Sequence, residues 1–384
     1  MTAKVFELLH TTKIVHGEGA LKRMAERLKQ QGFNTSLVVT DSTLVKTGLV
    51  TKVTNALEEV GVRSIVYDKV EPNPTAESVD EGSQWVKEYS VDNIIAVGGG
   101  SSIDCAKGIS VLATNGGNIR DYEGADTWKT PKMFLTAIPT TVGTGSEVTF
   151  GSVITDKSRK LKMIVAGEDL SPRLAVLDPQ MVANLPSNVT AATGMDALTQ
   201  AIEAYISSNA TPITDALNIY AIKLVSENIR AAVWSNDYQA LANMQMAATI
   251  AGIGFINGGL GIVHAISNTI GGIYGTPHGI TNAILLPYGM EFNLPTNLKK
   301  FADIAVAMGE NIEGLSLREA AERAISSVKQ LSRDLEIPEK LSEIGVTDEF
   351  AEKIAALSID TPDIKTNPRH YSPSLVEEVF RNAL

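Results

Sequence analysis

An acid, an amide and two histidines are the residues whose types and spacing could do chemistry. The stretch MDALTQAIEAY (195–205) predicts a helix on which Asp196 and Gln200, four residues apart, are neighbours on one face. His264 and His278, two of the five histidines in the chain, flank the glycine-rich segment HAISNTIGGIYGTPHG. Imidazole and carboxylate ligands together suit a divalent transition metal. The spacing alone also fits an exposed polar helix face and two ordinary histidines, so both interpretations stay open.

A second chemical signal is the stretch VGGGSSIDCAKG (97–108), in which an apolar strand runs into three glycines. A helix is expected to begin just after them, near Ser101 or Ser102. Glycines allow close approach of a ligand to the backbone, and the helix start offers unpaired N–H groups and a positive dipole end. The pattern favours a pyrophosphate site. It is not the G-x-G-x-x-G fingerprint, however, and a tight structural turn would need the same residues.

Two further segments are expected at the same edge of a sheet. PTTVGTGSE (139–147) is another loop rich in glycine and threonine, and it follows a strand. Asp41 ends the strand LVVTD, where a carboxylate could accept hydrogen bonds from an adenosine ribose. Open parallel sheets bind ligands beyond the carboxyl ends of their strands, where all three segments would lie. Asp41 could equally be the N-cap of the helix that follows.

The elements that must position these residues change type once along the chain. Short β-rich runs are expected at residues 35–41, 63–70, 92–100, 132–141 and 173–179. They alternate with helical patterns such as 20–32 and 42–61, and 150–167 reads as a hairpin. From about residue 186 helical periodicity takes over. We therefore predict an α/β N-terminal dinucleotide-binding domain (1–185), a parallel sheet with flanking helices, followed by an all-α C-terminal domain (186–384).

Composition limits the classes of partner. The net charge of −11 argues against binding to nucleic acid or to anionic membranes, and the longest apolar runs are broken well before about 18 residues. The single cysteine, Cys105, cannot form an internal disulfide. The first residues lack the order of a signal peptide. We expect a soluble, cytoplasmic protein that spans no membrane.

Over essentially its full length the sequence resembles the iron-containing (group III) alcohol dehydrogenases. The matching stretches are EPNPT (71–75), GGGSSIDCAK (98–107), PTTVGTGSE (139–147), TAATGMDALTQAIEAY (190–205), GLGIVHAISNTIGGIYGTPHG (259–279) and TNPR (366–369). The resemblance implies NAD(P)H and a divalent ion as cofactors, and interconversion of small alcohols and aldehydes. It also implies a homodimer or higher homo-oligomer.

The resemblance assigns roles to individual positions of this chain. The implied metal ligands are Asp196, Gln200, His264 and His278. The implied cofactor-binding residues, to which we add Asp41, are Asn73, Gly98, Gly99, Gly100, Ser101, Asp104, Thr140, Thr141, Thr144 and Lys162. The catalytic residues that the resemblance implies are Asp104, Lys162, Asn268 and Phe255. Asp363 and Lys365 are expected near the substrate, where their charges would suit a polar or anionic substrate or belong to a solvated loop.

Three positions depart from the family pattern. Gln200 stands where a third histidine ligand is usual, and an amide oxygen is a poorer donor than imidazole for Fe²⁺ or Zn²⁺. Asn268 stands where a second histidine is common, and an amide cannot carry a proton. Ile103 replaces a histidine often found in the glycine loop. We expect Gln200 to be either a weak fourth ligand or a hydrogen-bond donor to substrate.

The function predicted from these residues is an NAD(H)-dependent, metal-assisted alcohol dehydrogenase or aldehyde reductase. Fe²⁺ is the ion expected first, with Zn²⁺ or another divalent ion as the alternative. Because of Gln200 and Asn268, two other functions stay open. One is a carbonyl reductase of the same fold that works without metal or on a polar substrate, and the other is a nucleotide-binding relative without turnover.

Overall fold

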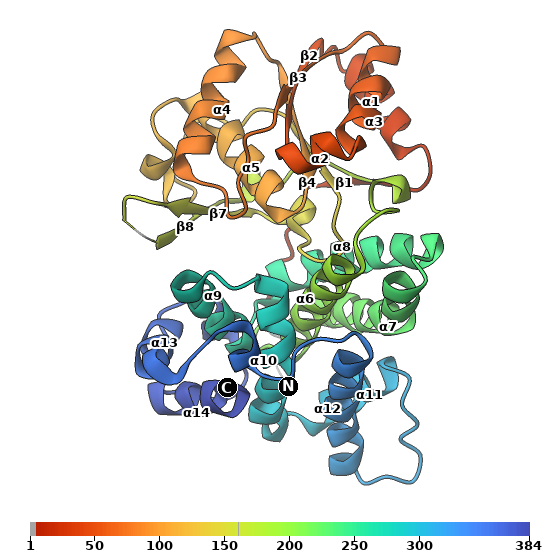
Figure 1. The fold of residues 1–384 in the computed structure, drawn as a ribbon, viewed down its shortest axis with the longest axis vertical. Helices are drawn as coiled ribbons and strands as arrows, with labels where there is room; N and C mark the ends of the chain where they lie inside the picture. Colours follow the sequence, from red (N-terminus) through yellow and green to blue (C-terminus); the bar gives the residue numbers. More distant parts are fainter. Residues whose placement is uncertain (1–4, 160) are drawn as a thin grey trace. The chain divides into compact units, whose positions relative to one another are not determined.

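The chain folds into two units in this computed structural model, which describes residues 5–159 and 161–384 (Figure 1). One unit consists of Leu9–Thr141 and Gly145–Asn184, and it holds all the strands of the described residues. The other consists of Val142–Thr144, Leu185–Leu384 and residues 5–8, and its regular structure is helical. The predicted fold class, an α/β part followed by a helical part, is confirmed.

The main sheet of the α/β unit has six strands, all parallel to their neighbours, in the order β1-β9-β6-β4-β2-β3. The strands are β1 (Lys13–His16), β2 (Thr35–Val39), β3 (Arg63–Tyr67), β4 (Asn93–Gly98), β6 (Leu135–Pro139) and β9 (Leu174–Leu177). Five of them lie in the runs predicted from sequence. The sixth, β1, was not predicted, because its sequence KIVH has only two apolar residues and both of its ends are exposed.

Helices cover both faces of this sheet, as the alternation of strands and helices predicts. In the central strand β4 every residue is buried. Ile94 and Ala96 pack into the core on one face, and Ile95 and Val97 pack into the core on the other. The helices of this unit are α1 (Ala20–Gln30), α2 (Ser42–Lys46), α3 (Leu49–Glu59), α4 (Ala76–Glu88) and α5 (Gly100–Asn115). Helices α4 and α5 belong to the first core, and α1 and α3 to the second.

One helical prediction needs correction. The sequence predicts one helical pattern over 42–61, but this stretch forms two helices, α2 and α3, that meet at Gly48. Gly48 has φ 79°, a left-handed conformation that a helix cannot continue through and that glycine adopts at little cost. The short α2 therefore sits directly after β2, with Asp41 at its start.

A smaller sheet in the order β5-β8-β7 completes this unit. Its strands are β5 (Gly124–Ala125), β7 (Gly151–Asp156) and β8 (Leu161–Ala166). β7 and β8 pair antiparallel, which confirms the predicted hairpin. The two-residue strand β5 is too short to carry a periodic pattern and was not predicted.

A buried lysine fastens the hairpin to α5. The Lys107 ammonium is fully buried and donates hydrogen bonds to the hydroxyls of Ser146 and Thr149 and to the Gly151 carbonyl, at 3.0, 3.0 and 2.7 Å. One turn earlier on α5, the Asp104 carboxylate accepts from the Ser146 hydroxyl at 2.6 Å and from the Val153 backbone N–H at 2.9 Å. Burial lowers the pKa of Lys107, and the nearby Asp104 charge opposes that shift.

The helical unit is built around α6 (Ser187–Ile206), which packs against α7, α8 and α10. Every residue of α6 from Gly194 to Ile206 is buried. The other helices are α7 (Pro212–Trp234), α8 (Tyr238–Gly258), α9 (Ile262–Tyr274), α10 (His278–Asn293), α11 (Leu298–Ala307), α12 (Leu317–Asp334), α13 (Ala351–Ser358) and α14 (Pro373–Ala383). No single helix of the described ranges is long and apolar enough to cross a membrane; only α8 and α9 together, bent by 101°, reach that length and composition.

The role of Lys107 can be tested by Lys107→Met, which keeps the length of the side chain and removes its three donors. The free energy of unfolding should fall by about 3 kcal/mol, because buried acceptors and the Asp104 charge lose a partner. Denaturant unfolding followed by circular dichroism measures the change, with Lys22→Met, at an exposed position of α1, as the control. A loss no larger than that of the control would show that Lys107 does not hold the hairpin.

Candidate metal and cofactor sites

Helix α6 carries three polar side chains on one buried face. Asp196, Gln200 and Glu203 recur at intervals of four and three residues, and each is at least 96% buried. Asp196 and Gln200 are neighbours, as their spacing predicts: the Gln200 Nε2 donates a hydrogen bond to the Asp196 Oδ2 at 3.2 Å. Buried carboxylates need a compensating charge or hydrogen bonds. The interpretation of this face as an exposed, solvated one is therefore wrong.

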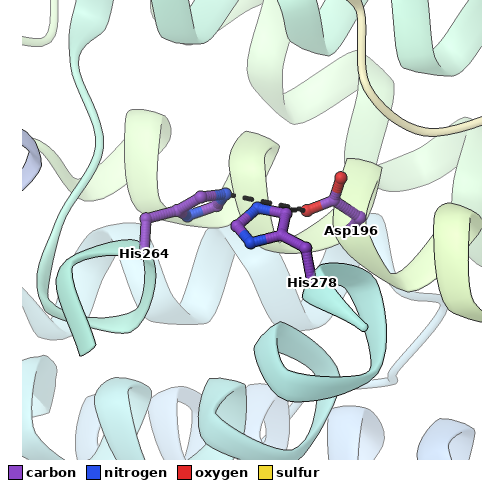
Figure 2. Close-up of side chains that lie close together, drawn as sticks. All are labelled: Asp196, His264 and His278. Atoms are coloured by element: carbon purple, nitrogen blue, oxygen red, sulfur yellow. Dashed lines mark ion pairs between the residues drawn. The ribbon is translucent and has the colours of Figure 1, made fainter. Parts of the chain in front are cut away.

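Two histidines from two other helices meet Asp196. His264 lies on the first turn of α9 and His278 is the first residue of α10. Their Nε2 atoms each lie 3.7 Å from the Asp196 Oδ1, and one ligand atom from each of the three residues falls within 4.8 Å of the others (Figure 2). His264 is buried, whereas the side chain of His278 is 40% exposed. One carboxylate and two imidazoles thus converge in the way that a divalent transition metal requires.

Glu203 orients the His264 ring. Its Oε2 lies 2.6 Å from the His264 Nδ1, and its Oε1 accepts from the Val263 backbone N–H at 2.7 Å. Because a carboxylate only accepts, the His264 Nδ1 carries the hydrogen and the Nε2 faces Asp196. Glu203 is not among the site residues predicted from the sequence. Its position, seven residues after Asp196 on the same helix, was the available signal.

A glycine allows α10 to approach α6. A Cβ atom on Gly279 would lie 2.4 Å from the carbonyl oxygen of Ala192, a backbone atom that cannot move aside without moving the helix. The preceding residue, His278, is therefore held close to Asp196 by helix packing. Its Nδ1 also lies 3.3 Å from the Ser267 hydroxyl of α9.

The charges of this cluster are coupled. Burial alone would lower the pKa of His264, but the nearby Asp196 and Glu203 carboxylates, the second of them hydrogen-bonded to Nδ1, outweigh burial and raise it to about 10. Burial alone would raise the pKa of Asp196, but the two histidines and a hydrogen bond from Asn282 hold it below its usual value. The pocket therefore favours positive charge.

The donor set fits a bound cation. Asp196 offers a carboxylate oxygen, and His264 and His278 offer imidazole nitrogens. The Gln200 Oε1 is buried and has no hydrogen-bond partner among the described residues. A buried amide oxygen without a partner is unusual, and a cation would satisfy it. The ligand role of Gln200 stays a prediction.

A second amide–acid pair lies one turn further along α9. The Asn268 Nδ2 donates to the Asp363 Oδ2 at 2.9 Å. Asp363 begins the short helix η8 (Asp363–Thr366), which packs against α9. Burial raises the pKa of Asp363, and the charge of His264 opposes that rise. The exposed Lys365 follows on η8.

In the α/β unit, the three glycines form the turn from β4 into α5. Gly98 has φ 152°, and a Cβ there would lie 2.4 Å from the Ser102 hydroxyl oxygen. Gly99 is the N-cap of α5, and no side chain of the described residues caps this helix start. Gly99, Gly100 and Ser101 are partly exposed. The first backbone N–H groups of α5 therefore have no side-chain cap, and their binding of a phosphate stays a prediction.

Other predicted cofactor residues border this turn. β2 and β4 are neighbours, and the chain leaves β2 toward β3 but leaves β4 toward β6, so the strand order reverses there. Ligands bind at such points in open parallel sheets. The Asp41 Oδ1 accepts from the backbone N–H groups of Thr43 and Leu44, so Asp41 is the N-cap of α2. A role for Asp41 at a ribose stays a prediction.

The remaining predicted residues are placed as follows. The Asn73 backbone N–H donates to the Ser101 hydroxyl at 3.3 Å, and Thr141 is the side chain that a Cβ on Gly99 would meet. The Thr140 N–H donates to the Gly98 carbonyl. Lys162 lies half-buried on β8, where burial lowers its pKa.

Asp104 has the structural partners described above. Thr144 groups with the helical unit, and Phe255 is half-buried near the end of α8. The catalytic or cofactor-binding roles of these three residues stay predictions.

Both halves of the chain match models of one family. Residues 11–179 match the model for iron-containing alcohol dehydrogenase, and residues 190–384 match the C-terminal model of the Fe-containing alcohol dehydrogenase family. The chain is 42% identical over 371 residues to the NAD-dependent methanol dehydrogenase of Bacillus methanolicus. This match covers 96% of this chain and 97% of that protein. It is 40% identical over 386 residues to the 1,3-propanediol dehydrogenase of Citrobacter freundii, with 100% of both chains covered. The crystal structure of a 1,3-propanediol oxidoreductase matches with a TM-score of 0.97 at 40% identity, over 99% of this chain and 100% of that chain.

Gln200→His should tighten the binding of divalent ions on the order of tenfold, because it restores an imidazole nitrogen on the face of Asp196. Gln200→Leu, which keeps similar bulk without a ligand atom, should weaken binding. Calorimetric titration of Zn²⁺ into chelator-treated protein compares the three proteins. Equal affinities in all three would show that residue 200 does not contact the ion.

Proposed function

Because this chain belongs to the iron-containing alcohol dehydrogenase family, we propose that it transfers a hydride between NAD(H) and a short alcohol or aldehyde with the help of a divalent ion, Fe²⁺ being the ion expected first. The observation that carries the proposal is the buried cluster of Asp196, His264 and His278. Two relatives are a methanol dehydrogenase and a 1,3-propanediol dehydrogenase, which supports a small substrate.

Each part of the chain has a defined task in this reaction. When bound, the nicotinamide supplies the hydride donor or acceptor, and the divalent ion polarises the substrate oxygen. Asp196 and the two imidazoles hold the ion, and Glu203 keeps the His264 Nε2 free for it by accepting from Nδ1. The uncapped start of α5 binds the pyrophosphate through backbone N–H groups.

The substrate could carry a second polar group besides the reacting alcohol or aldehyde. The Asp363 carboxylate is the feature of the site that favours such a substrate. This carboxylate is partly exposed and bonded to Asn268, which lies one turn from His264 on α9. A hydroxyl group could donate a hydrogen bond to Asp363, whereas an anionic substrate would be repelled by it. Since Asn268 cannot titrate, the alcohol proton leaves through water, the ribose hydroxyls or Asp363.

The proposal is tested by NADH oxidation with a panel of short aldehydes, with and without a 3-hydroxyl group. Activity should be lost on chelation and return with Fe²⁺, Zn²⁺ or Mn²⁺, since Asp196 and the histidines need an ion to act on substrate. Metal content by elemental analysis accompanies each assay. Full activity in metal-free protein would favour the metal-independent reductase instead. No oxidation of NADH by any aldehyde would favour a nucleotide-binding protein without turnover.

Asp41 should make the enzyme prefer NAD(H) to NADP(H), because its negative charge would repel a 2′-phosphate. Asp41→Asn is the suitable variant, since it keeps an oxygen that can cap α2 and removes the charge. Its ratio of kcat/KM for NADH to that for NADPH should fall at least about fivefold, a difference of roughly 1 kcal/mol. Glu59→Gln, which removes an exposed acid at the end of α3, is the control. Equal efficiency with both cofactors in the unmodified enzyme would contradict the assignment.

A further inference from the structure

The amide of Asn282 faces all three residues of the candidate metal cluster. Asn282 is fully buried on α10, one turn after His278. Its Nδ2 lies 2.8 Å from the Asp196 Oδ1, 3.2 Å from the His264 Nε2 and 3.0 Å from the His278 Nε2. These are the three atoms that converge on a cation. One terminal atom of Asn282 thus faces every one of them.

This orientation of the amide leaves its other end unsatisfied. The Asn282 Oδ1 is buried and has no hydrogen-bond partner among the described residues. If both imidazoles are neutral, three acceptor atoms face the two hydrogens of the NH₂ group, and one acceptor is left over. If His264 is protonated, its Nε2–H and the NH₂ group are two donors that face each other at 3.2 Å. In either state the carbonyl oxygen is left over, although buried polar atoms are normally paired.

Gln200 repeats this arrangement at the other carboxylate oxygen of Asp196. Its Nε2 donates to the Asp196 Oδ2, and its Oε1 is buried without a partner in the described part of the chain. Two amides thus point their nitrogens at one carboxylate, and both carbonyl oxygens are unpaired. Turning either amide about its last torsion exchanges oxygen for nitrogen in place. An oxygen at that place would be stable only beside a positive charge.

We propose that Asn282 is a ligand of the divalent ion, which its carbonyl oxygen binds once the amide has turned. This assignment rests on the metal-dependent function proposed above and extends it by one residue. Asn282 shares with His278 the spacing that Asp196 shares with Gln200, so α10 presents an imidazole and an amide to the ion on one face. The added amide oxygen makes up for the imidazole that is missing at Gln200.

The added oxygen has a consequence for the choice of ion. Carboxylate and amide oxygens suit Mn²⁺ and other hard ions, whereas imidazole-rich sites suit Zn²⁺. Removal of the Asn282 oxygen should therefore weaken Mn²⁺ binding more than Zn²⁺ binding. A hydrogen-bond donor that merely fills the cluster would have the opposite effect, because it competes with the ion for the same three lone pairs.

The test is calorimetric titration of Mn²⁺ and of Zn²⁺ into the chelator-treated full chain, with the electron paramagnetic resonance of bound Mn²⁺ as a second readout. Asn282→Leu should raise the Kd for Mn²⁺ at least tenfold. Asn282→Asp, which keeps an oxygen and adds charge, should bind Mn²⁺ at least as tightly as the unmodified protein. The control is Asn218→Leu, which removes another fully buried amide of the helical unit, one with no partner for either amide atom among the described residues.

The outcomes separate this assignment from the proposed function. If the unmodified protein binds neither Mn²⁺, Fe²⁺ nor Zn²⁺, the metal-dependent function fails and the Asn282 assignment fails with it. If the unmodified protein binds Mn²⁺ and Asn282→Leu binds it equally or more tightly, only the Asn282 assignment is overturned. If Asn282→Leu does not fold, a Kd for Asn282→Asp well above that of the unmodified protein would overturn it.

Discussion

The structure of the candidate metal site depends on two carboxylates buried beside one imidazole. Asp196 and Glu203 lie on the same face of α6, each about 97% buried, and both interact with His264. Removing two negative charges from water is costly unless positive charge or hydrogen bonds replace the water. In the metal-free chain the raised pKa of His264 supplies part of that charge. A divalent ion with neutral imidazoles balances both carboxylates, so the charge of the pocket itself argues for the ion.

One spacing builds the rest of the site. On α6, α9 and α10, a charged or imidazole side chain is followed four residues later by an amide: Asp196 by Gln200, His264 by Asn268, and His278 by Asn282. Each of these amides donates a hydrogen bond to a carboxylate, either of Asp196 or of Asp363. Because residues four apart share a helix face, each helix contributes a pair of side chains from one turn. The positions of the helices are then set by close packing, as at Gly279.

The sequence allowed the parts of the fold with strong local patterns to be predicted, and the failures have physical causes. Five sheet strands were predicted because their runs are apolar, whereas β1 at the sheet edge has partly exposed residues and no such run. The break at Gly48 was missed because a glycine inside a helical pattern does not reveal its own φ. Glu203 could have been found from its spacing, because it follows Asp196 by seven residues and so lies on the same helix face. The convergence of α6, α9 and α10 has no local signature, so the place of Asn282 against all three ligand atoms required the structure.

The two units differ in how they depend on side chains. The α/β unit offers a ligand mainly backbone N–H groups and a glycine turn, which constrain the conformation of the chain more than the identity of its side chains. The helical unit offers individual side chains on a scaffold held by packing, so one substitution can change the chemistry without changing the fold. Gln200 and Asn268 are positions of this kind, at which the family resemblance implies an imidazole. An amide in its place still offers a hydrogen-bond donor, but it cannot titrate, and the atom it offers to a metal is an oxygen. The buried carboxylates that attract a cation are present on α6, and the residue at position 268 does not titrate. Asn268 instead donates a hydrogen bond to Asp363, so this amide positions an acid beside α9 where it cannot act as one itself.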